Sequence, residues 1–139
     1  MAQPLDVATV KRMLVEIDAA IAKQDAAGVA RHFAGGVTIN QKVRASGGTE
    51  TYKFSKGEYV AYLRDAWAQT SDYRYKRSDE TIRITGPTRA VVTALVTESG
   101  RTQGIRMTSS SAETAVIELV DGRPLVVRLD ADTEISASR

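Results

Sequence analysis

From Asp72 to its end, the sequence consists of strand patterns separated only by tight turns. Gly86-Pro87, Ser99-Gly100 and Asp121-Gly122 are the expected turns, and Asp-Gly is a strong signal for a two-residue type I′ hairpin. Strands joined by connections this short pair antiparallel. The second half of the chain therefore predicts an antiparallel sheet of four strands, and the apolar face of that sheet needs a cover.

Three helices predicted in the first half supply that cover. Apolar residues between Val7 and Ile21 recur at intervals of three and four, which is typical of an amphipathic helix, and Asp6 is its expected cap. Asp25 caps a short second helix, which Gly35-Gly36 is expected to end. Ser55-Lys-Gly-Glu58 is a capping box that opens a third helix.

The strand patterns give the remaining organisation. A strand over Val37–Arg44 and its return partner Thr49–Phe54 lie between the second and third helices. The buried parity changes between residues 75 and 82, which predicts a β-bulge near 77–80. The last strand is expected to bury Leu125, Val127, Leu129 and Ala131. Helices that precede strands predict one α+β domain over residues 1–139, in which the helices lie against one face of a curved, mostly antiparallel sheet.

Composition excludes several classes of function. The chain has 139 residues, no cysteine, one histidine and a formal charge of +2. No disulfide, thiol nucleophile, multi-histidine metal site or resident cofactor is therefore expected, and the basic excess is too small for a dedicated nucleic-acid binder. No apolar run is long enough to cross a membrane.

The start of the chain bears on its location. Met1-Ala2-Gln3-Pro4 lacks the pattern of a secretory signal, which predicts a cytoplasmic protein. The same start also fits a chain whose signal peptide has been removed, so a periplasmic or secreted location stays open.

Four segments resemble a known superfamily. Asp25–Asn40 is similar to the second helix and first strand of nuclear transport factor 2-like proteins, and Ser55–Leu63 is similar to their third helix. Ile82–Thr93 and Ile117–Arg123 resemble their closing hairpins. The most similar members are the SnoaL-like and small bacterial ketosteroid-isomerase-like ones. The resemblance implies a cystatin-like α+β cone with a pocket at its open end, and a homodimer formed through the sheet.

Members of this superfamily include isomerases, dehydratases, cyclases and binding domains, so the fold alone does not decide function. In the isomerase-like members the resemblance implies a general-base Asp on the first strand, a position that is Gln41 here. Their helix-one Tyr falls on Ile17, and their second acid lies near Met107. Because an amide cannot take a proton from carbon, the steroid-isomerase apparatus is expected to be absent.

The remaining candidates each have a structural alternative. His32 is the one side chain whose unperturbed pKa lies near neutrality, so it is either a general acid/base or a packed residue at a helix end. Gln41 either orients a ligand oxygen or is a buried amide with partners in the protein. The aromatic residues cluster between Tyr52 and Tyr75, and Tyr59, Tyr62, Trp67 and Tyr73 are candidates for a ligand pocket together with Ile17 and Met107. Core packing plus a dimer surface is the alternative for this cluster.

Three hypotheses follow. The first is a small-molecule-binding or accessory domain with a mostly apolar pocket, for an apolar or carbonyl-containing ligand. The second is a SnoaL-like isomerase, cyclase or dehydratase, with His32 as the acid/base; the departures at Gln41, Ile17 and Met107 weigh against an enzyme without deciding the question. The third is a dimerisation module with a filled cone. A pocket group with a perturbed pKa would favour catalysis over simple binding.

Overall fold

The computed structural model describes residues 3–138. Three helices and six strands follow one another within this range. Along the chain they are α1 (Val7–Ala22), α2 (Ala26–Ala30), β1 (Phe33–Ala45), β2 (Gly48–Phe54), α3 (Lys56–Ala68), β3 (Ser71–Gly86), β4 (Arg89–Thr102), β5 (Ile105–Val120) and β6 (Arg123–Ser138). This order is the predicted one, with helices early and four hairpin-connected strands late.

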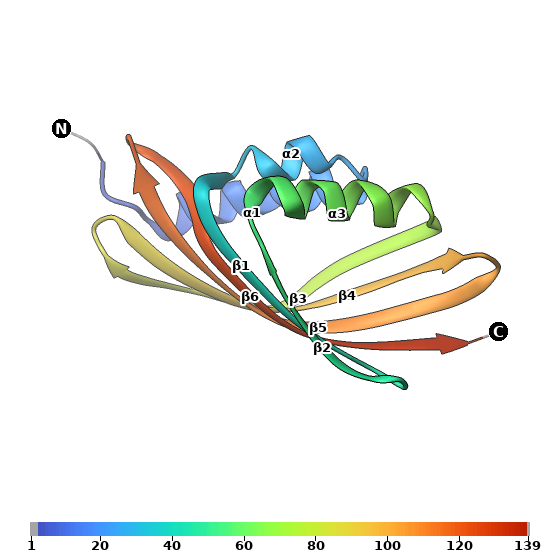
Figure 1. Cartoon of the computed structure of the whole chain (residues 1–139). Helices are drawn as coiled ribbons and strands as arrows, with labels where there is room; N and C mark the ends of the chain where they lie inside the picture. The colour runs from blue at the N-terminus through green and yellow to red at the C-terminus, as the bar shows by residue number, and fades with distance from the viewer. Residues whose placement is uncertain (1–2, 139) are drawn as a thin grey trace.

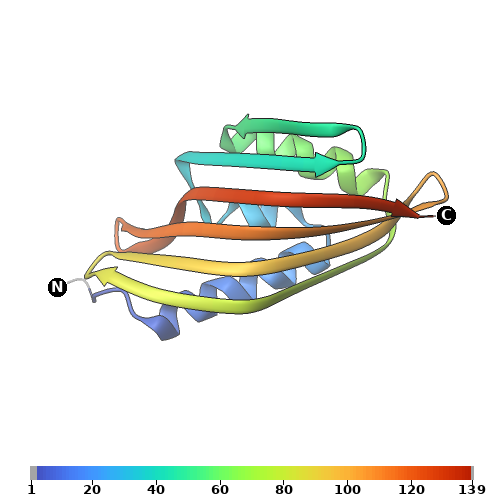
Figure 2. The same cartoon turned by 90° about the horizontal axis from the view of Figure 1, so that it is seen from below.

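The strands form one six-stranded sheet in the order β2-β1-β6-β5-β4-β3. Neighbouring strands pair antiparallel except for β1 and β6, which are parallel. The sheet is strongly curved, and the three helices lie on its concave side (Figure 1). The convex side, seen from below, is formed by the strands alone (Figure 2). The predicted α+β cone with a curved, mostly antiparallel sheet is confirmed.

Each helix begins at the cap that the sequence predicts. Asp6 accepts a hydrogen bond from the Thr9 amide at 2.8 Å, and Asp25 accepts one from the Gly28 amide at 3.0 Å. At α3 the capping box is complete, because Ser55 Oγ accepts from the amide of Glu58 and the Glu58 carboxylate accepts from the amide of Ser55. These caps satisfy amides that have no partner within their helix.

The predicted bulge in β3 is present. The register between β3 and β4 shifts between Ser78 and Thr81, and Asp79 adopts a positive φ of 52°. The extra residue changes which parity faces inward. Tyr75 and Arg77 consequently point into the cone on one side of the bulge, and Ile82 does so on the other side.

Two glycine-containing pairs of residues do not have the predicted role. Gly35-Gly36 lies inside β1 and not at the end of α2, because β1 already pairs with β6 at Phe33 and Val126. Ser99-Gly100 lies inside β4, and the turn falls at Gln103 and Gly104, both with positive φ. Gly100 is needed for another reason: a Cβ at this position would collide with the Thr70 side chain.

The inward residues of β6 also differ from the prediction. A register shift between Val116 and Ile117 places Val126 inward at 3% exposure, so the expected alternation through Leu125 and Val127 is wrong there. Beyond the shift Leu129 is inward as predicted. The extra residue of this bulge is Val127 of β6, which has no partner on β5. Because residues 125–127 are all apolar, the apolar pattern of the strand does not reveal the bulge, which explains the error.

The apolar core fills only one end of the cone. It joins α1 to the ends of the strands near Ala90, Ile117 and Val126, and its members are buried. No α3 residue is fully buried, although Tyr59, Leu63 and Trp67 pack against the edge of this core. The core does not fill the other end of the concave face, under α3, and a cavity lies there. No helix within residues 3–138 has the length and apolar character needed to cross a bilayer.

Candidate functional site

A cavity of about 240 Å³ lies between α3 and the concave face of the sheet. Its walls include Ile39 and Gln41 from β1, Glu98 from β4, Met107, Ser111 and Glu113 from β5, Ala131 from β6, and Tyr59, Tyr62 and Trp67 from α3. A second cavity of about 70 Å³ lies deeper, toward α1. The two share Tyr59, Leu63, Trp67, Glu98, Glu113 and Leu129 as walls, so these residues stand between an outer and an inner chamber.

Aromatic rings form the helical side of the cavity. Tyr59 stacks on Phe33 at a centroid distance of 5.8 Å, and Tyr62 contacts Phe54 at 5.1 Å. Trp67 meets Tyr73 at 6.1 Å. Rings in contact at these distances present broad apolar faces with few rotatable bonds, which suits a flat or cyclic ligand.

Glu113 is the most unusual group in the cavity. Its partners across the sheet are Ala94 on β4 and Ala131 on β6, so both flanking inward positions carry only a methyl group. Burial raises the pKa of the Glu113 carboxyl to about 7, with Arg77 opposing the rise and Glu98 adding to it. A carboxyl with a pKa near neutrality can both accept and donate a proton under physiological conditions.

Glu98 shares the cavity wall. The Tyr73 hydroxyl donates a hydrogen bond to its carboxylate. Burial raises the pKa of Glu98, and this hydrogen bond counteracts part of the rise. Burial also raises the pKa values of Tyr59, Tyr62 and Tyr73, so their hydroxyls stay protonated at neutral pH and serve as hydrogen-bond donors.

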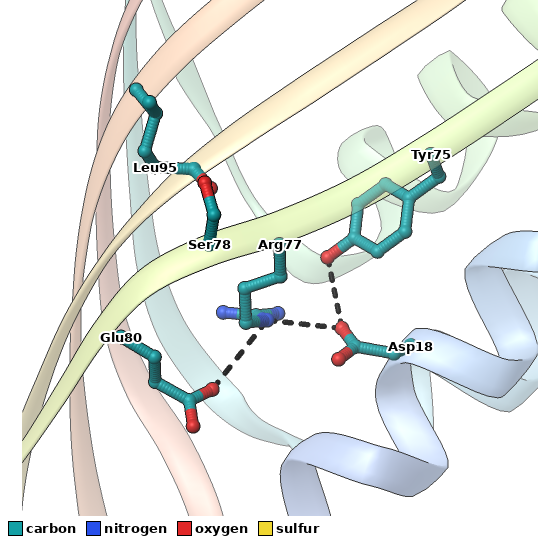
Figure 3. A network of polar contacts seen from close by, with 6 residues as sticks. All are labelled: Asp18, Tyr75, Arg77, Ser78, Glu80 and Leu95. Atoms are coloured by element: carbon teal, nitrogen blue, oxygen red, sulfur yellow. Dashed lines mark hydrogen bonds and ion pairs between the residues drawn. The ribbon is translucent and has the colours of Figure 1, made fainter.

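A network of polar contacts closes the inner chamber on the α1 side (Figure 3). Arg77 Nε donates to Asp18 Oδ1 at 3.0 Å, and the Tyr75 hydroxyl donates to the same oxygen at 2.9 Å. The Arg77 guanidinium also lies 3.9 Å from Glu80. The Arg77 side chain is only 12% exposed, so its charge acts inside the cone and not in bulk solvent.

Gln41 lies at the predicted place on the inward face of β1, opposite Ala131. Its Oε1 is buried and has no hydrogen-bond partner in the protein. On the neighbouring row, the hydroxyls of Ser111 and Thr133 satisfy each other at 2.7 Å. Gln41 is therefore the cavity amide whose acceptor is free for a ligand.

His32 lies outside the outer chamber, next to Glu16 of α1. Its Nε2 is 3.4 Å from Glu16, the carboxylate partner that the sequence did not reveal. Burial lowers the pKa of His32, Glu16 opposes this, and the nearby Arg123 and Arg31 lower the pKa further. The residue borders two shallow surface depressions with Glu16 and Arg31, and neither depression shares a residue with the outer chamber.

The structure brings most of the predicted pocket residues together. Gln41, Tyr59, Tyr62, Trp67, Tyr73 and Met107 all line the outer chamber. Ile17 lines only the inner chamber. Sequence reasoning missed Glu98 and Glu113, although Glu113 shares its parity with the inward Ala115 and Ile117, and Glu98 shares its parity with Val92 and Val96. That parity could have identified both carboxyls.

Two arginines of β3 that lie three positions apart have different surroundings. Arg74 is exposed and pairs with Asp72 at 3.9 Å, while Arg77 turns inward. Asp130 and Asp132 lie on the outer face of β6, where Asp130 binds Asn40 and Arg128 and Asp132 binds Arg44. Residues 3–138 contain no cluster of histidine and carboxylate side chains arranged to hold a metal ion.

Compared by sequence, the chain matches no family model and no curated protein. Solved structures with the same fold are numerous. A candidate scytalone dehydratase from Novosphingobium aromaticivorans superposes with a TM-score of 0.74 at 15% identity, covering 94% of this chain and 86% of the other. The hexachlorocyclohexane dehydrochlorinase LinA-type3 from Novosphingobium barchaimii gives 0.72 at 12% identity, with coverages of 94% and 88%.

An NTF2-like protein from Cytophaga hutchinsonii gives a TM-score of 0.69 at 15% identity, covering 92% of this chain and 98% of the other. At such low identities these likenesses concern the fold. The chain has the nuclear transport factor 2-like fold that the sequence segments resembled.

The raised pKa of Glu113 predicts a pH dependence of stability. Between its ordinary pKa of 4.5 and about 7, the folded protein keeps a proton on Glu113 that the unfolded chain has lost. The free energy of unfolding therefore falls as pH rises through this window, by up to about 3 kcal/mol from this group, and levels off above it. Glu113→Gln removes that component, as urea unfolding at pH 5 and pH 8 will measure.

Glu118→Gln, on the outer face of the same strand, is the matched control and should keep the wild-type pH dependence. An unchanged difference between pH 5 and pH 8 in Glu113→Gln would contradict the assignment of a buried, protonated carboxyl.

Proposed function

We propose that the protein binds a small, largely apolar molecule in the outer chamber of its cone. The observation that carries this proposal is the cavity of about 240 Å³ between the rings of α3 and the sheet. Ligand pockets are mostly apolar concavities with a few convergent polar groups, and Gln41, Glu98 and Glu113 are such groups here. The open cavity argues against a dimerisation module with a filled cone.

The proposed pocket contains its own reporter, because Trp67 lines it and is the single tryptophan of the chain. Cyclohexanone and benzyl alcohol are suitable neutral probes, and their binding should change the Trp67 emission. Ala131→Phe places a ring inside the chamber, so it should displace the probes and lower their affinity at least about tenfold, since burying one ring contributes roughly 2 kcal/mol.

Ala112→Phe is the control, because Ala112 neighbours Glu113 in sequence but is exposed on the outer face. Equal affinities in both variants and the wild type would contradict binding in the chamber.

A second function, proton transfer on a small carbonyl compound, is supported by one further observation. Glu113 faces the cavity with a pKa of about 7, which suits a general base. In the proposed step, the Glu113 carboxylate takes a proton from the carbon next to the carbonyl. The electrons of that C–H bond move to the carbonyl oxygen, which accepts a hydrogen bond from Gln41 Nε2 or a tyrosine hydroxyl. If the substrate is a β,γ-unsaturated carbonyl compound, the resulting dienolate takes the proton back at its γ-carbon, and the double bond moves into conjugation with the carbonyl group, which completes an isomerisation.

This proposal transfers to Glu113 the role that the sequence offered to His32, because His32 does not reach the chamber. Exchange of cyclohexanone α-protons in deuterated buffer, followed by NMR, measures the step without knowledge of the natural substrate. Wild-type exchange should rise with pH through about 7 as Glu113 ionises. Glu113→Gln should slow exchange roughly a hundredfold or more.

His32→Gln is expected to leave the exchange rate unchanged. A loss of exchange in His32→Gln, or full exchange in Glu113→Gln, would contradict the assignment.

We also propose that the protein forms a homodimer through the convex face of its sheet. We further propose that the protein is located in the cytoplasm. No helix of the described residues covers the convex side of the sheet (Figure 2). The outward residues of β4 and β5 on this side are small or medium-sized, among them Thr93, Leu95, Ala112 and Thr114. Native mass spectrometry at micromolar concentration should give twice the mass of 15.1 kDa. A spectrum of monomer alone would contradict the dimer.

A further inference from the structure

The polar groups that face the outer chamber are unequally divided between donors and acceptors. Glu113 has no hydrogen-bond partner within residues 3–138, although its side chain borders both chambers. Gln41 Oε1 is buried and also lacks a donor. An ionised carboxylate and an amide oxygen only accept hydrogen bonds. A molecule that satisfies both must bring donors with it.

These two acceptors lie on the same row of the sheet. Gln41 is paired with Ala131, and Ala131 is paired with Glu113, so one small residue separates them. Two strand spacings place their backbones about 10 Å apart, and both residues line the outer chamber. The methyl group of Ala131 leaves the space between them open.

The residues that line the two chambers also carry more acidic than basic groups. Among the described residues that line either cavity, Arg77 is the single basic one. Its guanidinium already contacts Asp18 at 3.0 Å and Glu80 at 3.9 Å. Glu98 receives only the neutral hydroxyl of Tyr73. Glu113 is therefore a carboxyl without a counter-ion of its own, in a chamber whose other wall is aromatic.

We propose that the ligand of the outer chamber carries a protonated amine, held between Glu113 and the amide oxygen of Gln41. An ammonium group has three donors and no acceptor, which matches the two free acceptors and leaves one donor for water or a tyrosine hydroxyl. The apolar part of such a ligand packs against Tyr59, Tyr62 and Trp67, whose ring faces also attract cations. This inference rests on the proposed function, since it names the class of ligand that the same chamber takes.

Pairs of probes that have the same shape but differ in charge distinguish the effect of charge on binding from the effect of shape. Benzylamine and benzyl alcohol share a ring and a length, as do cyclohexylamine and cyclohexanol, and Trp67 emission gives each affinity. At pH 7.5 each amine should bind at least about tenfold tighter than its alcohol, because a hydrogen bond to a charged group is worth more than a neutral one. Glu113→Gln should abolish this preference, and Glu118→Gln should keep it.

Wild-type protein provides a test that does not depend on a folded variant. The ratio of amine to alcohol affinity should rise several-fold between pH 6 and pH 8, because binding of the cation favours ionised Glu113. Calorimetry of benzylamine binding at pH 7 in phosphate and in Tris should reveal net proton release. Gln41→Leu should weaken amine binding more than alcohol binding.

Alcohols that bind as tightly as the amines, or an amine preference that survives Glu113→Gln, would overturn this inference and leave the proposed binding function standing. Failure of all four probes to bind would overturn the binding function and the inference together.

Discussion

The contact between Arg77 and Asp18 affects both the architecture of the cone and the chemistry of its cavity. It ties α1 to β3 across the concave face, and the Tyr75 hydroxyl strengthens the same contact. A guanidinium that is 12% exposed needs such a partner, because removal of one member of a buried ion pair typically costs 3–5 kcal/mol. Since Asp18 and Glu80 engage Arg77, its charge is only partly available to Glu113, and burial remains the larger influence on that carboxyl.

The cavity exists because the sheet is longer than the core that covers it. Large aliphatic residues fill the end near Ile117 and Val126, whereas the inward positions under α3 include the small residues Ser111, Ala131 and Thr133. Small side chains on a concave face leave space, and aromatic rings from α3 cover that space without filling it. The proposed binding and the proposed proton transfer both rest on this one arrangement, which supplies a chamber with an aromatic wall and a carboxyl whose pKa lies near neutrality.

Local patterns predicted most of the fold. Helix caps and the capping box at Ser55 were visible because each depends on residues three positions apart, and the β3 bulge was visible as a change of parity. Errors arose where the deciding partner is distant in sequence. Gly100 is required by the approach of Thr70, and the inward turn of Val126 depends on the pairing with β5. The aromatic wall and Gln41 were likewise predictable, but the arrangement of Arg77, Asp18 and Glu113 required knowledge of which faces meet, since charged residues on a strand ordinarily indicate solvent.

The most direct test of this account is the titration of Glu113 itself, followed by the carboxyl ¹³C resonance of labelled protein and assigned with Glu113→Gln. The account predicts a midpoint near 7 in the free protein, and a lower midpoint when benzylamine is bound. A midpoint near the ordinary value of 4.5 would show that the carboxyl is hydrated or paired, and would contradict both its proposed catalytic role and its role as an unpaired acceptor in the chamber.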